Sequence, residues 1–221
     1  MSDPIVRDFS ERDPLTPGFW DQRFSQQFTP WDQGGVPPEL IRMVAGAVRP
    51  LRTLIPGCGM GHEVRHLVQA GWPVVAIDFS TLAVAAARRA LGEFAEHVQH
   101  ADFFSYLPPQ QIELVYERAF LCALPRVRWP DVVARAAALL APGGLLAGYY
   151  FYDDGLKGPP FGADRGALDA LMAPWFELLE DVPAAQSIAV FAGKERWQRW
   201  RRRAEGAIFD TAECYGLHPQ I

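Results

Sequence analysis

Apolar residues follow two different spacings along this chain. In residues 19–28 and 36–48 they recur every three or four positions, which is the period of an amphipathic helix. From residue 51 onward, short runs of branched apolar residues alternate with further stretches of helical period. Uninterrupted runs of this kind are typical of strands buried on both faces of a parallel sheet. The pattern predicts strands at residues 51–55, 73–77, 97–101, 112–116 and 145–152, and helices at 62–71, 81–91, 131–140 and 164–173.

Regular alternation of strands and helices specifies an α/β fold with a mostly parallel sheet and helices on both faces. Two more apolar runs, residues 176–181 and 187–191, follow the last predicted helix. We expect them to form a hairpin at the sheet edge, which gives a seven-stranded sheet with an antiparallel terminal strand. The expected organisation is a single domain over residues 1–221, with residues 1–50 as an N-terminal arm and 204–221 as a tail of no predicted structure.

Residues that begin and end these elements support the boundaries. Ser80 is suited to cap the helix at 81–91, because its hydroxyl can accept a hydrogen bond from a free N–H of the first turn. The helix at 131–140 is expected to end at the Ala-Pro-Gly-Gly sequence of residues 141–144. Proline and glycine near the two ends of residues 29–35 mark that stretch as a loop.

The charge balance argues against a polyanionic substrate. The 221-residue chain carries 26 acidic and 21 basic side chains, a net charge of −5, whereas nucleic-acid-binding domains usually have an excess of Lys and Arg. The basic residues that do cluster, at 194–203, are interpreted as a solvated helix face or as a binding edge for an anionic group. We therefore expect a small-molecule substrate and no nucleic acid.

The cysteines and the length of the apolar stretches indicate where in the cell the protein is expected. Cys58, Cys122 and Cys214 are odd in number and lack the spacing of a metal or redox site, which indicates a reduced protein. The polar start of the sequence predicts no signal peptide, and no apolar run reaches the roughly 18 residues of a membrane span. His62 and His66 have no evident third ligand, so no metal is expected. We expect a cytoplasmic monomer with no membrane partner.

A glycine-rich loop connects the first predicted strand to the following helix. Gly57, Gly59 and Gly61 allow a sharp turn and let a ligand approach the backbone amides, near the free N–H groups of the helix. A dinucleotide-binding loop has the spacing G-x-G-x-x-G. This loop reads G-x-G-x-G, with Cys58 inside it and His62 where the third glycine would stand. The spacing favours S-adenosylmethionine, which has no pyrophosphate to bind.

Acidic residues end the next two predicted strands. Asp78 lies 21 residues after Gly57, where its carboxylate can accept hydrogen bonds from both ribose hydroxyls. Asp102 ends the third strand, near the expected position of an adenine ring, with Phe79 or Phe103 covering that ring. Because ligands of open α/β sheets bind at the carboxyl ends of the strands, these groups are expected to share one nucleoside site.

Several motifs together resemble the thiopurine S-methyltransferase family, and within it the branch of thiol and halide methyltransferases. They read FWDQRF (19–24), TPWDQGG (29–35), IPGCGMGHEV (55–64), VVAIDFS (74–80), YERAFLCALP (116–125), LLAPGGLL (139–146), GPPF (158–161) and GKERWQRW (193–200). The resemblance extends over residues 19–203. It implies a Rossmann-like methyltransferase fold, S-adenosyl-L-methionine as methyl donor, S-adenosyl-L-homocysteine as product, and a small thiol as acceptor.

The resemblance also implies roles for individual residues. The aromatic helix and the TPWD loop look like a lid over the cofactor, so Trp20 and Trp31 would contact S-adenosylmethionine, with its sulfonium cation against an aromatic face. The further matches are Gly57 with the methionine moiety, Asp78 with the ribose, and Asp102 and Phe103 with the adenine.

Three positions vary within the family or depart from related enzymes. Phe24 stands where relatives often have a second tryptophan. Ile55 stands where many methyltransferases have an acidic residue for the cofactor ammonium, so other groups would have to bind it. Arg118 matches a cofactor-side position that is arginine in thiopurine-type members and tyrosine in plant thiol or halide members.

The expected chemistry makes few demands on the protein. A thiol with a pKa of about 8.5 is partly ionised at neutral pH and strongly nucleophilic. We therefore hypothesise catalysis by alignment and desolvation, without a dedicated general base. Arg118 is the one candidate catalytic residue, because it could lower the pKa of the thiol or steer an anionic acceptor. Phe161, after the fifth predicted strand, would line the acceptor pocket, and Cys58 and Cys122 are interpreted as small buried hydrophobes.

Three alternatives stay open. The acceptor could be a halide, a hydrosulfide ion or a metalloid anion, since TPWDQGG and KERWQRW favour that branch while Arg118 favours the thiopurine branch. The same fold would suit an NAD-dependent oxidoreductase. A binding module that keeps the cofactor without turnover is the third.

Overall fold

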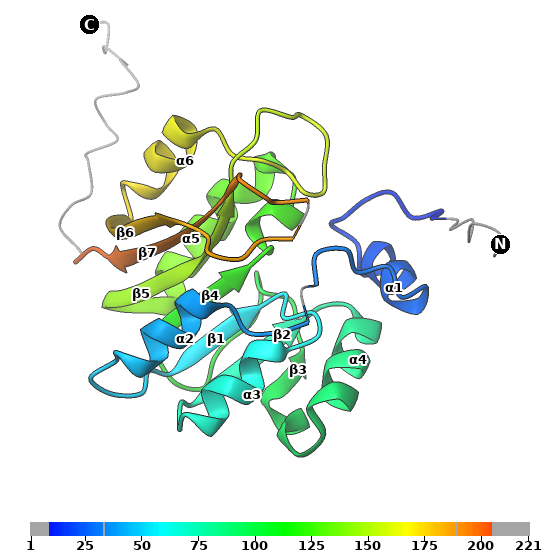
Figure 1. Ribbon diagram of the computed structural model, residues 1–221, viewed down its shortest axis with the longest axis horizontal. Coiled ribbons are helices and arrows are strands. Elements are labelled where there is room, and N and C mark those ends of the chain that lie inside the picture. The colour runs from blue at the N-terminus through cyan, green and yellow to red at the C-terminus, as the bar shows by residue number, and fades with distance from the viewer. Residues whose placement is uncertain (1–8, 33, 189, 205–221) are drawn as a thin grey trace, which may run out of the picture.

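A seven-stranded sheet with the strand order β3-β2-β1-β4-β5-β7-β6 forms the centre of the molecule (Figure 1). The computed structural model describes residues 9–32, 34–188 and 190–204. The five strands β3, β2, β1, β4 and β5 pair in parallel, and β7 is antiparallel to both of its neighbours. The strands are β1 (Thr53–Pro56), β2 (Val74–Asp78), β3 (Val98–His100), β4 (Ile112–Arg118), β5 (Leu140–Phe151), β6 (Phe176–Pro183) and β7 (Glu195–Arg202). The predicted mixed sheet is confirmed.

Helices cover both faces of the sheet, as predicted. They are α1 (Pro17–Ser25), α2 (Pro38–Ala45), α3 (His62–Gln69), α4 (Thr81–Leu91), α5 (Trp129–Leu139) and α6 (Arg165–Met172), with short 3-10 turns η1 (Gly92–His97), η2 (Leu121–Ala123) and η3 (Arg126–Arg128). The apolar sides of α2, α3 and α4 pack in one core, and those of α5 and α6 pack in another. Neighbouring strand residues alternate between these cores: Leu54 belongs to the second and Ile55 to the first. None of the helices in the described ranges is long and apolar enough to cross a bilayer.

The register of the central strands brings the predicted site residues to one edge. Pro56 pairs with Ile77, so the glycine loop after β1 and the end of β2 at Asp78 lie side by side. Asp78 in turn pairs with His100, two residues before Asp102. The helix α1 lies at this edge beside α4 (Figure 1). The carboxyl ends of β1, β2 and β3 therefore meet under a helix from the N-terminal segment.

Most predicted elements are found within a few residues of their expected bounds. The helix at Thr81–Leu91 matches the prediction, and the Ser80 hydroxyl accepts a hydrogen bond of 3.0 Å from the Ala83 N–H, which confirms the cap. The boundary after α5 differs. The strand β5 already begins at Leu140, opposite Ile112, and the expected Ala-Pro-Gly-Gly turn is an irregularity inside it, where Gly143 has a φ of +82°.

The last strand was predicted in the wrong place. The run at residues 187–191 is a turn in its described residues, in which the Phe191 N–H donates to the Ile188 carbonyl over 3.0 Å. The Arg-rich segment instead forms β7, inserted between β5 and β6. Phe191 is nevertheless buried in a small apolar cluster with Cys122 and Phe151, and Ile188 packs against that cluster partly buried.

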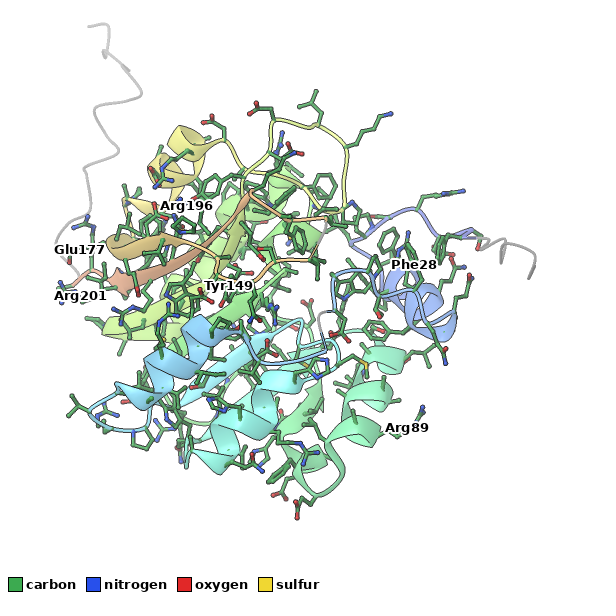
Figure 2. The ribbon with its side chains drawn as sticks, in the orientation of Figure 1. Phe28, Arg89, Tyr149, Glu177, Arg196 and Arg201 are labelled. Atoms are coloured by element: carbon green, nitrogen blue, oxygen red, sulfur yellow. The ribbon has the colours of Figure 1, made fainter. Side chains whose placement is uncertain are left out.

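Both interpretations of the Arg-rich segment are therefore corrected. Two tryptophans three positions apart fit one face of a helix, but on this interior strand Trp197 and Trp200 enter opposite cores. The arginines find carboxylate partners on β6: Arg196 with Asp181, Arg199 with Glu180, and Arg201 with Glu177. Figure 2 shows Arg201 and Glu177 together at the free end of this pair of strands. The anionic groups that this segment binds are therefore carboxylates of the neighbouring strand β6.

Candidate functional site

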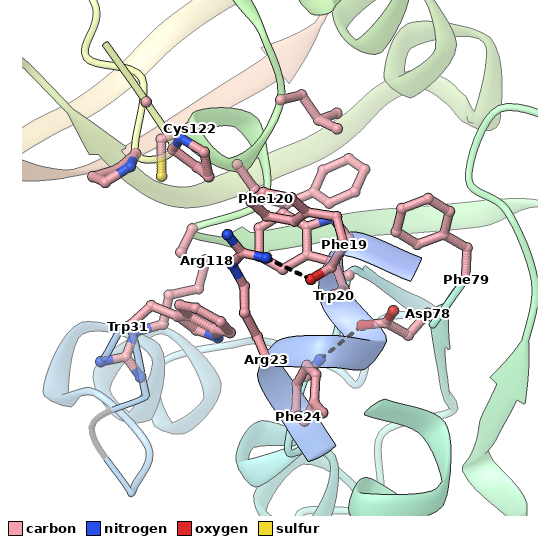
Figure 3. Close-up of a pocket in the computed structure, with 18 of the residues that line it drawn as sticks. Phe19, Trp20, Arg23, Phe24, Trp31, Asp78, Phe79, Arg118, Phe120 and Cys122 are labelled. Atoms are coloured by element: carbon pink, nitrogen blue, oxygen red, sulfur yellow. Dashed lines mark hydrogen bonds between the residues drawn. The ribbon is translucent and has the colours of Figure 1, made fainter. Parts of the chain in front are cut away.

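A cavity of 590 Å³ lies at the carboxyl edge of the sheet, between the strand ends and α1. This volume is within the range of sites for cofactors and drug-sized ligands. Most of its lining is apolar and aromatic (Figure 3). Nine residues proposed from the sequence line it: Trp20, Trp31, Gly57, Gly59, Asp78, Phe79, Asp102, Phe103 and Arg118.

The glycine loop forms one wall of the cavity. Gly57, Gly59 and Gly61 all have a φ between +52° and +70°, a conformation that residues with a Cβ rarely adopt. A Cβ on Gly57 would also come within 2.5 Å of the Phe120 ring. Gly61 packs against Leu91 rather than the cavity. A side chain at position 57 would thus be strained in its backbone and would collide with the Phe120 ring.

Cys58 turns away from the cavity that its glycine neighbours line. Its N–H donates to the Ile77 carbonyl over 3.1 Å, and its side chain is buried in the core beside α3 and α4. Burial raises the pKa of the Cys58 thiol, and that of the Cys122 thiol, well above its usual value. Both are therefore neutral thiols; Cys58 lies in the core, and Cys122 is buried at the edge of the cavity, which it helps to line. Cys214 lies outside the described residues.

Asp78 is a buried carboxylate that faces the cavity. Its Oδ2 accepts the Gly59 N–H over 3.1 Å, and its Oδ1 accepts the Ser80 N–H over 2.9 Å. Burial raises the pKa of this carboxyl group to about 6, although the two N–H groups lower it. Since each carboxylate oxygen has about two lone-pair sites, both oxygens can still accept a hydrogen bond from a ligand hydroxyl.

The third strand end contributes a polar and an aromatic residue. Asp102 is exposed at the cavity, and its Oδ1 accepts the Phe104 N–H over 3.0 Å. Phe103 is buried, and its ring centroid lies 5.2 Å from that of Phe120. Phe79 lines the cavity beside Asp78 (Figure 3).

Aromatic side chains of the N-terminal segment close the other side. The rings of Trp20 and Trp31 meet edge to face with centroids 5.4 Å apart, and Phe24 lies 6.2 Å from Trp31. The Trp20 indole N–H donates to the Pro14 carbonyl over 2.8 Å, which fixes its ring. Phe24 therefore belongs to this aromatic wall, at a position where relatives often have a second tryptophan.

Two carboxylates attach this segment to the body of the protein. Asp21 of α1 accepts the Ser80 hydroxyl over 2.6 Å and the Leu82 N–H over 3.0 Å, at the N-terminus of α4. Asp32 contacts His62 Nε2 over 2.8 Å at the start of α3, and this hydrogen bond raises the pKa of His62 and lowers that of Asp32. Within the described ranges no cluster of ligand side chains around His62 could hold a metal ion.

Arg118 lines the cavity at the end of β4, and its charge is already compensated. Its Nη1 lies 3.2 Å from a carboxylate oxygen of Glu63 and donates to the Gly35 carbonyl over 3.1 Å. The guanidinium also lies 5.5 Å from the Tyr149 ring centroid. The negative charge of Glu63 would therefore weaken the attraction of Arg118 for an anionic acceptor.

The acceptor-side wall differs from the one expected. Phe161 is not among the lining residues; its N–H donates to the Cys122 carbonyl over 2.7 Å, and its ring packs against Gly158. Gly158, Pro159 and Pro160 of the same GPPF motif line the cavity instead. The motif therefore lines the cavity with Gly158 and the two prolines, and the Phe161 ring packs against Gly158 outside the lining.

Sequence reasoning missed several lining residues. Arg23, on the same face of α1 as Trp20, reaches the cavity, and so does Phe120, which packs against Gly57. The helical spacing of Trp20 and Arg23, three positions apart, could have indicated the first. Nothing in the local sequence marks Phe120, because its place depends on how η2 folds back over β1.

The chain matches the model of the thiopurine S-methyltransferase family over residues 15–203. Among its relatives, thiocyanate methyltransferase 1 of Arabidopsis thaliana is 30% identical, with 84% of this chain and 85% of the relative aligned. A thiopurine S-methyltransferase of Shewanella amazonensis is 28% identical, with 75% of this chain and 85% of the relative aligned.

Solved methyltransferase structures share the fold. A 1,6-didemethyltoxoflavin-N1-methyltransferase of Burkholderia thailandensis, solved with S-adenosylhomocysteine, superposes with a TM-score of 0.66 at 17% identity, over 85% of this chain and 87% of that one. The N-methyltransferase NodS of Bradyrhizobium japonicum gives a TM-score of 0.62 at 18% identity, over 75% and 85%. The chain belongs to the thiopurine S-methyltransferase family and is an S-adenosylmethionine-dependent methyltransferase.

Proposed function

We propose that this enzyme transfers the methyl group of S-adenosylmethionine to the sulfur of a small thiol inside the cavity under α1. The observation that carries the proposal is the pairing of the left-handed glycine turn at Gly57 and Gly59 with the buried Asp78 carboxylate, both of which line the cavity at one sheet edge. The names of the relatives, which include a probable thiol methyltransferase 2 of Arabidopsis thaliana at 29% identity, support sulfur as the acceptor atom.

The lining residues fit the parts of the cofactor. Asp78 would accept the two ribose hydroxyls, and the bare backbone at Gly57 and Gly59 would let the methionine moiety approach. Asp102 would accept the adenine N6 amine. Phe79 and Phe103 offer aromatic surface for the adenine ring, and the faces of Trp20 and Trp31 would attract the positive sulfonium. When bound, S-adenosylmethionine supplies an electrophilic methyl carbon.

The protein's own contribution is alignment and the exclusion of water. Well-oriented reactants can gain about 7–11 kcal/mol of the barrier from their arrangement. The aromatic wall of Trp20, Phe24 and Trp31 covers the cavity and would remove the water that stabilises a thiolate. Cys58 and Cys122 stay neutral because they are buried, so neither competes as a nucleophile. Arg118 would help to position the cofactor near the glycine loop, and the Glu63 carboxylate balances its charge.

Two tests separate this proposal from its rivals. Titration calorimetry with S-adenosylhomocysteine and with NADH should give binding of the first alone; binding of NADH would favour the oxidoreductase. A transfer assay over organic thiols, iodide, bisulfide and arsenite should show the highest kcat/KM for an organic thiol. Faster transfer to an inorganic anion would replace the thiol as acceptor, and binding without any transfer would indicate a binding module.

Replacement of Asp78 tests the nucleoside site. Asp78→Asn should raise the Kd for S-adenosylhomocysteine about 10- to 100-fold, because hydrogen bonds to a charged partner contribute about 1.5–3 kcal/mol. Calorimetry at pH 7.5 measures the change. Asp131→Asn, at an exposed carboxylate on α5 that pairs with Arg128, serves as the matched control and should bind like the wild type.

The pH dependence gives a second readout of the same group. Because the pKa of Asp78 in the free protein is about 6, protonation competes with the ribose hydroxyls at lower pH. The affinity of the wild type should fall as the pH drops from 7 to 5, with a steeper fall than that of Asp78→Asn. Equal slopes for the two proteins would remove Asp78 from the ribose site.

A further inference from the structure

Three arginines of the described chain line the cavity, and their charges are compensated unequally. Arg118 has the Glu63 carboxylate at 3.2 Å. Arg23 and Arg12 form no ion pair with any carboxylate in residues 9–32, 34–188 and 190–204. Asp78 and Asp102 also line the cavity, and neither forms an ion pair with these two arginines. Arg23 and Arg12 therefore add positive charge to the α1 side of the cavity that no ion pair of the described residues offsets.

Arg23 is held in one orientation by neighbours that leave its charge in place. Its Nη1 donates to the Phe19 carbonyl over 2.7 Å, and its guanidinium lies 3.2 Å from the Phe19 ring centroid and 4.6 Å from that of Phe9. One of its five N–H donors is used by the carbonyl, so the others stay available to a ligand. Figure 3 shows the side chain rising from α1 into the cavity, toward Phe120 and away from Asp78.

The electrostatic surroundings of Arg23 also favour an anion. Burial lowers the pKa of its guanidinium, and the charge of Arg12 lowers it further. An arginine remains protonated in proteins under such conditions, so the group stays cationic at some cost in free energy. An anion between α1 and the floor of the cavity would offset that cost.

We propose that Arg23 determines acceptor specificity by binding a carboxylate group that the acceptor thiol carries. This inference rests on the proposed function. The planar guanidinium matches a carboxylate with two parallel hydrogen bonds, whereas a thiolate sulfur offers a single acceptor atom. The Arg23 guanidinium points away from Asp78 (Figure 3), which argues against a contact with the ribose. The competing anion is the carboxylate of the cofactor's own methionine moiety near Gly57, and the affinity for S-adenosylhomocysteine distinguishes the two.

The reaction leaves this carboxylate unchanged. The thiol loses its proton to solvent and binds as a thiolate. The thiolate electron pair forms the new S–CH3 bond while the bond from that carbon to the donor sulfur breaks, and the released electron pair stays on the donor sulfur. Arg23 holds the acceptor's carboxylate throughout, so that the thiolate sulfur is kept in line with the methyl carbon.

Paired acceptors that differ in this one charge test the proposal. They are 2-mercaptobenzoate and its methyl ester, assayed by initial rates at saturating S-adenosylmethionine. We expect the wild type to have a kcat/KM at least tenfold higher for the acid than for the ester. Arg23→Gln should lower kcat/KM for the acid about 10- to 100-fold, mainly by raising KM, and change that for the ester by less than twofold. Arg23→Lys should retain part of the kcat/KM for the acid, because a lysine keeps the positive charge but cannot make the two parallel hydrogen bonds of a guanidinium.

Two controls accompany the kinetics. Arg89→Gln removes an arginine that projects into solvent from α4 (Figure 2) and should leave both acceptors unaffected. The Kd of Arg23→Gln for S-adenosylhomocysteine, measured by calorimetry, should stay within twofold of the wild type. That binding also shows that the variant is folded.

Each contrary outcome has a distinct meaning. An equal loss for acid and ester, or a large loss of S-adenosylhomocysteine affinity in Arg23→Gln, overturns the inference, because Arg23 would then serve the cofactor or the lid. A wild type that methylates the ester as fast as the acid also overturns it while leaving the proposed function intact. Binding of S-adenosylhomocysteine without transfer to either thiol overturns both.

Discussion

At the scale of single residues, a second buried carboxyl group lies beneath the cavity floor. Glu117 precedes Arg118 on β4, and its Oε2 accepts the N–H groups of Phe120 and Leu121 over 3.1 and 3.2 Å. Its Oε1 has no partner in the part of the chain that the structure describes. Burial raises the pKa of Glu117 to about 8. The segment that carries Phe120 over the glycine turn is therefore held by a carboxyl group that is mostly protonated at neutral pH.

This carboxyl group should make stability depend on pH. In the unfolded chain Glu117 ionises above its ordinary pKa of about 4.3, but in the fold it keeps its proton until about pH 8. The native state thus binds more protons between these values, and its stability falls as the pH rises, by at most about 1.4 kcal/mol per pH unit, and levels off above pH 8.

Glu117→Gln isolates the effect. The amide oxygen can still accept both N–H groups, and the side chain no longer ionises. In urea titrations, the free energy of unfolding of the variant relative to that of the wild type should increase steadily as the pH rises from 5 to 8. A difference that stays constant over this range would show that Glu117 does not titrate there.

The positions of residues at the cavity were predictable from the sequence where they depend on strand ends. Asp78 and Asp102 could be placed because a parallel sheet brings the carboxyl ends of its strands to one edge. Arg23 and Glu117 could not, because the place of Arg23 depends on the rotation of α1 against the sheet and that of Glu117 on the burial of a carboxyl group under η2. Phe161 illustrates the same limit: its motif lies at the cavity, but the path of the backbone at Gly158 turns its ring behind the wall.

At the scale of elements, α1 is attached to the domain through the N-terminus of α4. Asp21 accepts hydrogen bonds from Ser80 and Leu82 there, where a negative charge is stabilised by the helix dipole. These contacts fix the helix that carries both Trp20 and Arg23. The attachment therefore orders the upper wall of the cavity before any ligand binds.

Loss of this attachment should affect binding more than folding. Asp21→Ala should raise the Kd for S-adenosylhomocysteine about five- to tenfold, equivalent to about 1–1.4 kcal/mol, because α1 must then be ordered on binding. The free energy of unfolding should change by less than about 1 kcal/mol, since Asp21 is outside both cores. Calorimetry and urea titration measure the two quantities.

Asp131→Ala provides the comparison, because this acidic residue also lies in the first turn of a helix, α5, but away from the cavity. It should leave the Kd unchanged. A Kd for Asp21→Ala that equals that of the wild type would mean that α1 is held in place by its aromatic contacts alone.

Elements were predictable where one period dominates the apolar pattern. The helix at Thr81–Leu91 has a clear cap and a clean helical stripe. The strand β7 has neither an uninterrupted apolar run nor simple alternation, because it is an interior strand whose tryptophans serve opposite cores while its arginines pair with β6. Pairing between strands is information that a local pattern does not contain.

At the scale of the whole molecule, the cavity lies between two parts of the chain. One is the sheet with its covering helices, and the other is the N-terminal segment with α1 and the loop of Trp31, attached through Asp21 and Asp32. A ligand that touches both parts adds contacts between them. Ligand binding should therefore slow the opening of the N-terminal segment as well as stabilise the fold.

S-adenosylhomocysteine at 100 times its Kd should raise the free energy of unfolding by about 2.7 kcal/mol, as expected for a ligand that binds only the native state. Hydrogen exchange should slow in two separate places, the α1 segment and the glycine turn after β1, because the ligand contacts both. Exchange in β6, at the far edge of the sheet, should slow only through the global stabilisation. NADH at the same concentration serves as the control and should change neither quantity. Protection of the glycine turn without protection of α1 would mean that the aromatic helix is no part of the cofactor site, and Trp20 would lose the role proposed for it.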